Sequence, residues 1–255
     1  RQVADPPPAL ALPYDHPPAP APQGRTLDLA LPPGLTEAVL AQARAWKLSY
    51  FSVLLAAFQA LVHTRTGARD VPVTTTATGR TQARFEGVVG TFVNQLVLRL
   101  RHDPALDLHG NARATAAVLA DALAHQDLPF TEYLPAARAA APGSALDQVC
   151  FAMRRPDNFD TRTLGAVLLS ESAQGFEFGG MRLRTLPLAR DSGLRALSVF
   201  VQEAGGVLHL LWNYDAARFD AATIEGLAAD FAATLAATVD AVDAAPARRT
   251  RGMRT

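Results

Sequence analysis

The chain has 255 residues, of which 49% are hydrophobic and 19% charged, a composition typical of a globular protein with a sizeable core. Its 24 Lys and Arg balance 24 Asp and Glu, so the overall charge gives no reason to expect nucleic acid or an anionic membrane as the main partner. The sequence contains no Gly-rich phosphate loop, HExxH, paired CxxC or GxSxG. The common nucleotide, metal and hydrolase sites are therefore unsupported.

Hydrophobic periodicity predicts a mixed α/β fold. In chain order, we expect a strand at 26–31, helices at 36–46 and from 51 to Gly67, and strands at 70–79 and 91–100 around a polar loop at 79–90. Helices follow at 107–124 and 131–140, then strands at 148–153, 166–171, 181–185, 197–203 and 207–213. A last helix begins near Asp220, a suitable N-cap, and runs to about residue 242. This order predicts a mixed β-sheet covered by helices.

The two ends of the chain differ from the rest. Eight of the 18 prolines lie within residues 1–24, a density that opposes helices and sheet ladders. We assign 1–24 to a Pro-rich linker that drapes over a surface or joins something upstream, and 246–255 to a basic, disordered tail. The chain begins without Met, which indicates a piece of a longer protein. No apolar run is long enough to span a bilayer, and the start lacks the order of a signal peptide, so we expect a cytosolic protein.

Candidate catalytic side chains are scattered. Cys150 lies in an apolar run and is predicted to be a core residue rather than a nucleophile. No two of the six histidines are adjacent or four residues apart, and we interpret each as structural. His125 is expected at a helix C-terminus, where the helix dipole favours a cation. With Asp127 and Pro129 after it, this stretch is interpreted as a helix–turn–helix junction.

Two stretches carry a family resemblance. Residues 88–99 ("VVGTFVNQLVLR") and 124–130 ("AHQDLPF") resemble two core motifs of the condensation domains of nonribosomal peptide synthetases. Residues 50–73, 78–80, 146–151 and 210–231 resemble other parts of the same domains, so the resemblance covers about residues 12–240. Several positions depart from the family: Gln95 stands where Thr is usual and Thr131 where Glu is usual, and 144–147 and 194–196 lack the usual patterns.

The resemblance implies a particular half of that domain. Condensation domains are V-shaped, with two chloramphenicol acetyltransferase-like lobes and an HHxxxDG motif in the first lobe. This sequence has no HHxxxDG and begins where the second lobe begins, so residues 25–245 are expected to be a C-terminal lobe without a catalytic residue or metal of its own. The family joins substrates carried as thioesters on the phosphopantetheine arms of carrier proteins. The implied partners are the missing N-terminal lobe, carrier proteins and neighbouring synthetase domains, and no cofactor is bound directly.

The resemblance also suggests roles for single residues. Asn94 interrupts an apolar strand, and a buried amide without partners costs about 1–3 kcal/mol. It either lines the tunnel between the lobes, bonded to backbone or pantetheine, or ties two loops together within the lobe. The candidate tunnel or lobe-interface residues are Arg80, Gly90, Asn94 and Gln95, and the candidate bracing residues are His125, Asp127, Pro129 and Phe130.

Other interpretations remain open. The chain could be a non-catalytic condensation-like platform that recruits carrier or tailoring proteins, or an oligomeric acyltransferase whose site forms between subunits. Residues 156–192 are rich in Gly, Ser and charge, and in the family a segment of this region crosses onto the first lobe. Without that lobe, we expect this segment either to be mobile or to pair with another copy of the chain.

Overall fold

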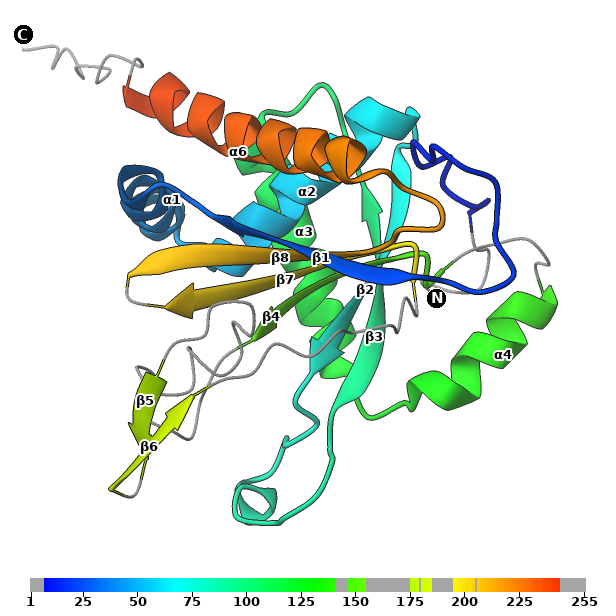
Figure 1. The fold of residues 1–255 in the computed structure, drawn as a ribbon, viewed down its shortest axis with the longest axis vertical. Helices are drawn as coiled ribbons and strands as arrows, with labels where there is room; N and C mark the ends of the chain where they lie inside the picture. Colours follow the sequence, from blue (N-terminus) through cyan, green and yellow to red (C-terminus); the bar gives the residue numbers. More distant parts are fainter. Residues whose placement is uncertain are drawn as a thin grey trace, which may run out of the picture.

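A single mixed β-sheet organises the molecule (Figure 1). The computed structural model describes residues 7–140, 146–154, 175–178, 180–184, 195–204 and 206–243. Helices pack on one face of the sheet, and one further helix packs on the other face near an edge (Figure 1). The predicted α/β fold, a mixed sheet covered by helices, is confirmed.

Six strands form the sheet in the order β1-β8-β7-β4-β2-β3. The pairs β2–β4 and β4–β7 are parallel and the other neighbours are antiparallel. A separate two-stranded sheet pairs β5 with β6. The strands are β1 (Gly24–Ala30), β2 (Asp70–Ala77), β3 (Asn94–Arg101), β4 (Val149–Arg154), β5 (Gly175–Phe178), β6 (Met181–Arg184), β7 (Leu197–Ala204) and β8 (Val207–Asp215).

The helices begin and end at residues with clear chemical reasons. Ser49 accepts a hydrogen bond from Ser52 N at the start of α2, and Gly67 ends that helix with φ 72°, a conformation that glycine adopts at little cost. Asp107 caps α3 in the same way through Gly110 N. The α-helices are α1 (Pro33–Trp46), α2 (Tyr50–Thr66), α3 (Leu108–Ala124), α4 (Phe130–Ala140) and α6 (Ala221–Asp243), and a short 3-10 turn covers Ala83–Phe85.

The structure changes one strand boundary that matters for the site. The strand expected from residue 91 begins at Asn94, which pairs with Ala77. The residues before it belong instead to the loop between β2 and β3. The strand expected at 166–171 and most of the segment 156–192 lie outside the described residues.

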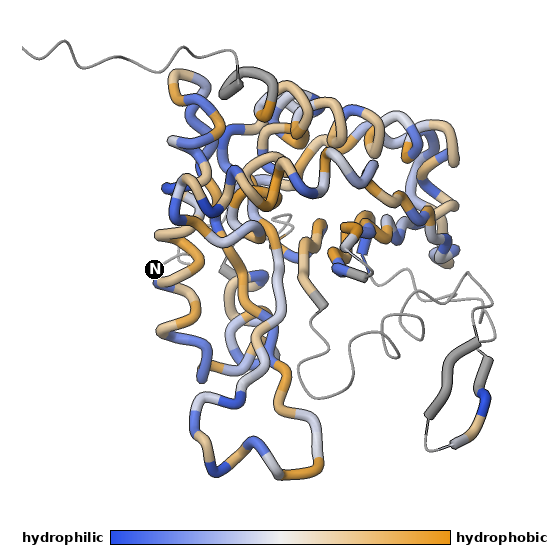
Figure 2. The backbone as a smooth tube through the Cα atoms, turned by 90° about the vertical axis from the view of Figure 1, so that its left-hand side faces the viewer, coloured by the Kyte–Doolittle hydropathy of each residue, from blue (hydrophilic) through white to orange (hydrophobic). Residues whose placement is uncertain are grey.

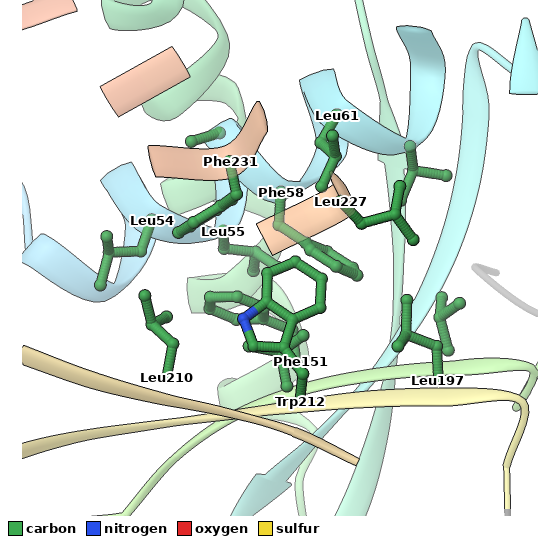
Figure 3. Packing of buried hydrophobic residues seen from close by; sticks show 14 of the residues in the cluster. Leu54, Leu55, Phe58, Leu61, Phe151, Leu197, Leu210, Trp212, Leu227 and Phe231 are labelled. Carbon is green, nitrogen blue, oxygen red and sulfur yellow. The ribbon is translucent and has the colours of Figure 1, made fainter. Parts of the chain in front are cut away.

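The core lies between the sheet and the helices α2 and α6. Figure 3 shows Phe151 of β4 and Trp212 of β8 under Phe58 of α2, with ring centroids 5.0 Å apart for Phe58–Phe151. Phe231 of α6 meets the Trp212 ring edge-on at 5.9 Å and 75°, an arrangement that aromatic pairs favour. Cys150 is buried, as predicted.

The apolar side chains of α6 contribute to this core. Within the ranges that the structure describes, α6 is the single helix that is by itself long and apolar enough to be a candidate membrane span. Its side chains Ile224, Leu227, Phe231 and Leu235 are nevertheless all buried in the cluster with the sheet. The buried face of this helix therefore packs against the sheet as part of the core.

The N-terminal proline-rich segment is packed against the sheet from residue 7 onwards. Leu10 is 4% exposed, and its N–H and C=O both pair with the Gln148 carboxamide, at 2.8 and 2.7 Å. Tyr14 accepts a further hydrogen bond from Gln148, and its ring contacts both the Phe219 ring and the Arg218 guanidinium. Residues 7–16 thus form a strap across the end of the sheet.

The same strap contacts the start of the last helix. The Asp15 carboxylate accepts hydrogen bonds from Asp220 N at 2.8 Å and from the Thr223 hydroxyl at 2.9 Å. The backbone N–H of Asp220 is the main reason why the pKa of Asp15 lies below its usual value. Asp220 itself, the expected N-cap, pairs with His16 at 2.9 Å. Asp15 therefore holds Asp220 and the first turn of α6 from a distant part of the chain.

Candidate functional site

Asn94 joins the two motifs that the sequence singled out. Its Nδ2 donates to the carbonyl oxygens of Gln126 and Leu128 at 2.8 and 2.7 Å. Its Oδ1 accepts from the backbone N–H groups of Gln95 and Phe130, both at 3.0 Å. Both donor hydrogens and both lone pairs of this carboxamide are therefore used by backbone. These contacts are those of an amide that ties two loops together.

Gln95 adds further links at the same place. Its side-chain Oε1 accepts from the Arg195 guanidinium, and its backbone oxygen accepts from the Tyr133 hydroxyl at 3.2 Å. We call Asn94, Gln95, Tyr133, Arg195 and the backbone of 126–130 the Asn94 corner. It connects the start of β3, the α3–α4 junction, helix α4 and the entrance to β7.

The loop between β2 and β3, residues 78–93, is held by Arg80. The guanidinium donates to the carbonyl oxygens of Phe85 and Gly90 and lies 4.3 Å from the centroid of the Phe92 ring. Gly79 has φ 67°, and a Cβ there would lie 1.9 Å from the Phe92 carbonyl oxygen. Only glycine fits this close approach without a backbone shift.

This loop presents apolar side chains to solvent. Val89 is 100% exposed, Val93 58% and Val88 44%. The loop projects from the sheet (Figure 1), and Figure 2 shows hydrophobic stretches along it. An ordered loop with exposed apolar side chains is typical of a contact surface.

The His-Gln-Asp turn forms the α3–α4 junction, in the position that its sequence predicts. His125 follows the last residue of α3, and its Nδ1 lies 2.8 Å from the Asp121 carbonyl oxygen. Pro129 precedes α4, and its carbonyl accepts from Glu132 and Tyr133. Phe130 N binds Asn94, whereas Asp127 is exposed. The structure therefore brings Asn94, Gln95 and Phe130 together and leaves the side chains of His125 and Asp127 at the surface.

The Asn94 corner offers hydrogen bonds rather than proton transfer. Its side chains are two amides, a guanidinium and a phenol, and burial raises the pKa of Tyr133 to about 12, with the Val97 N–H acting in the opposite direction. The phenol is thus protonated at neutral pH. The His125 side chain is 77% exposed. Within the described residues, no three His, Cys, Asp or Glu side chains are placed to hold a metal ion.

Asn94→Ala is expected to lower the free energy of unfolding by about 2 kcal/mol, because the carbonyl and N–H groups at the α3–α4 junction lose their partner. This differs from the small effect on stability that a tunnel-wall role alone predicts. Urea denaturation measures it. Asn94→Asp keeps the acceptors and removes the donors, so an intermediate loss of stability is expected. Equal stability of Asn94→Ala and the unsubstituted chain would show that Asn94 does not hold the two loops together.

Tyr133 and Arg195 belong to the corner but are not among the residues that the sequence singles out. Tyr133 lies one helical turn after Phe130, and its ring meets the Phe130 ring edge-on at 5.5 Å, so helical spacing could have suggested it. Arg195 is 100 residues from Gln95 in the chain. Only the order of the strands brings these two residues together.

The chain matches known proteins over nearly its whole length. The family model described as "Condensation domain" matches residues 1–248. A linear gramicidin synthase of Brevibacillus parabrevis is 31% identical over 90% of this chain, which spans only 4% of that protein. The phosphinothricin tripeptide synthetase PhsB of Streptomyces viridochromogenes is 29% identical over 94% of this chain, which spans 20% of it. The chain is thus similar to a small part of each of these much longer proteins.

Solved structures share the fold. A four-domain nonribosomal peptide synthetase bound to AMP and glycine matches with a TM-score of 0.84 at 20% identity, over 94% of this chain and 18% of its own. The first condensation domain of the calcium-dependent antibiotic synthetase matches with a TM-score of 0.67 at 21% identity, over 93% of this chain and 48% of its own. On the family match, the chain belongs to the condensation domains of nonribosomal peptide synthetases.

Proposed function

We propose that this chain is the C-terminal lobe of a condensation domain that forms amide bonds between carrier-bound thioesters. The observation that carries the proposal is the match of residues 1–248 to the family model. Two facts support the assignment to one lobe. The chain aligns with 48% of a structure that consists of one condensation domain, and its sequence lacks HHxxxDG.

In the proposed reaction, the amine of one carrier-bound substrate attacks the thioester carbonyl of the other. A C–N bond forms, the C–S bond breaks, the phosphopantetheine thiol leaves, and the amine proton must pass to a base. The Asn94 corner contains no side chain that accepts a proton at neutral pH. We therefore assign the base or positioning histidine to the HHxxxDG motif of the first lobe, and assign to this chain the shaping of the cleft wall.

The loop 78–93 is the proposed contact with the first lobe. Its exposed valines would be covered there, and the Arg80 contacts fix its shape before binding. A preorganised loop loses less conformational entropy when it binds. Arg80 and Gly90 thus act as lobe-interface residues that order the loop from within.

The phosphopantetheine arm reaches the domain on partner carrier proteins in this proposal, in the cytosol with the rest of the synthetase. The carboxamide of Asn94 has no free hydrogen-bonding position for the arm, because four backbone groups occupy it. We expect Asn94 to fix the shape of the wall rather than to bind the arm.

The test supplies the chain, the first lobe of its parent domain and loaded donor and acceptor carriers, and detects the amide product by mass spectrometry. Product is expected only when both lobes are present, because the second His of HHxxxDG is needed in this proposal. Replacing that His by Ala in the first lobe is the matched control. Turnover by the chain alone, clearly above a no-protein control, would contradict the assignment.

A further inference from the structure

Arg195 links parts of the sheet that are distant in the chain. It lies just before β7, and its Nη2 donates to Oε1 of Gln95 on β3. Strands β4 and β2 lie between β7 and β3. The contact therefore bridges two intervening strands.

The bridge lies on the face of the sheet that carries α4. Val97, two residues after Gln95, packs with Leu134 of α4, whereas Leu98 belongs to the core under α2 and α6. Because side chains alternate along a strand, Gln95 points to the α4 side. The Tyr133 hydroxyl of α4 meets the Gln95 carbonyl there.

The positive charge of Arg195 strengthens the bridge. Arg195 is partly buried, and its Nε atom is buried with no hydrogen-bond partner among the residues that the structure describes. A charged guanidinium makes a stronger hydrogen bond with an amide oxygen than a neutral donor does. Gln95 is thus held by Arg195 through its side chain and by Tyr133 through its backbone.

Gln95 in turn orients Asn94. The Gln95 N–H donates to Asn94 Oδ1, the atom that also accepts from Phe130 N. With Oδ1 fixed by two donors, Nδ2 points to the Gln126 and Leu128 carbonyls. A shift of Gln95 would therefore move Asn94 and weaken its hydrogen bonds to the α3–α4 junction.

We propose that Arg195 and Tyr133 are positioning residues that act through Gln95 to hold the Asn94 corner in one conformation for the carrier-bound substrate. The proposal rests on the proposed function, in which this corner forms part of the cleft wall. The wall contacts the substrate away from the reacting atoms. A more mobile wall should weaken binding of the substrate in the ground state and in the transition state equally. KM is therefore expected to rise while kcat changes little.

The first test is amide hydrogen exchange on the chain itself. Arg195→Met should speed exchange at Gln95 and Phe130 by about tenfold, since both amides donate to Asn94 Oδ1. Arg195→Lys retains a donor for Gln95 and should restore most of the protection. Arg113→Met, at an exposed position of α3, is the matched control and should leave both amides unchanged, whereas Tyr133→Phe should shift them in the direction of Arg195→Met.

The second test uses the complete condensation domain with loaded carriers. Arg195→Met is expected to raise KM about fivefold with kcat within about twofold, and Arg195→Lys to lie near the unsubstituted domain. Unchanged exchange at Phe130, or faster exchange spread equally over β4 and β7, would overturn the proposal. An unchanged KM despite faster Phe130 exchange would overturn it too. Failure of the proposed function is distinguishable, since the unsubstituted domain would then give no amide product at all.

Discussion

Phe151→Ala is expected to lower the free energy of unfolding by about 3–5 kcal/mol. Phe151 is 0% exposed and packs against Phe51, Phe58 and Phe231, which come from α2 and α6. Removing the ring loses its burial and leaves a cavity between the sheet and two helices that cannot all collapse into it. Denaturant unfolding followed by circular dichroism measures the loss.

Leu123→Ala is the control for this prediction. Leu123 lies on α3 and is 38% exposed, so its truncation should change stability by no more than about 0.5 kcal/mol. Phe151→Leu, which keeps most of the apolar volume, should lie between the two. Equal losses for Phe151→Ala and Leu123→Ala would show that the layer under α2 and α6 is not the main core.

Gly79→Ala is expected to weaken binding of the first lobe by about tenfold or more. The added Cβ would lie 1.9 Å from the Phe92 carbonyl oxygen, at a residue with φ 67°. Because that neighbour is backbone, the loop itself must move, and the contacts of Arg80 with Gly90 and Phe92 must change. Isothermal titration calorimetry with the first lobe measures the effect.

Gly87→Ala is the matched control in the same loop. A Cβ at Gly87 would meet no atom within 4 Å, and the backbone there has no positive φ. This variant should bind the first lobe like the unsubstituted chain. If both glycine variants bind equally well, the shape of the loop does not determine the lobe contact.

The parts of the fold with local chemical causes could be predicted from the sequence. Ser49, Gly67 and Asp107 bound helices within a few residues of the expected places, because caps act on the neighbouring turn. The start of β3 lies three residues later than the sequence predicts. Residues 91–93 (Thr, Phe, Val) are of types that favour strands, but the Arg80 contacts and the Gly79–Phe92 approach hold them in the loop.

Of the candidate site, only the residues with a local signal in the sequence could be predicted. A carboxamide in an apolar strand must find hydrogen-bond partners, so Asn94 could be singled out, together with the resemblance of the two motifs. Its partners could not be identified, since the carbonyls at 126 and 128 lie more than thirty residues away. Arg195 was beyond prediction because its contact with Gln95 depends on the strand order β7-β4-β2-β3.

The most direct test of the central claim is whether this chain binds the first lobe of its parent domain. Size-exclusion chromatography with light scattering, at concentrations above the dissociation constant found by calorimetry, gives the mass of the complex. A one-to-one complex is expected, with exchange of the amides in loop 78–93 slowed on binding because the exposed valines become covered. Two lobes that elute separately at these concentrations, with unchanged exchange in that loop, would contradict the claim that this chain is the second half of a condensation domain.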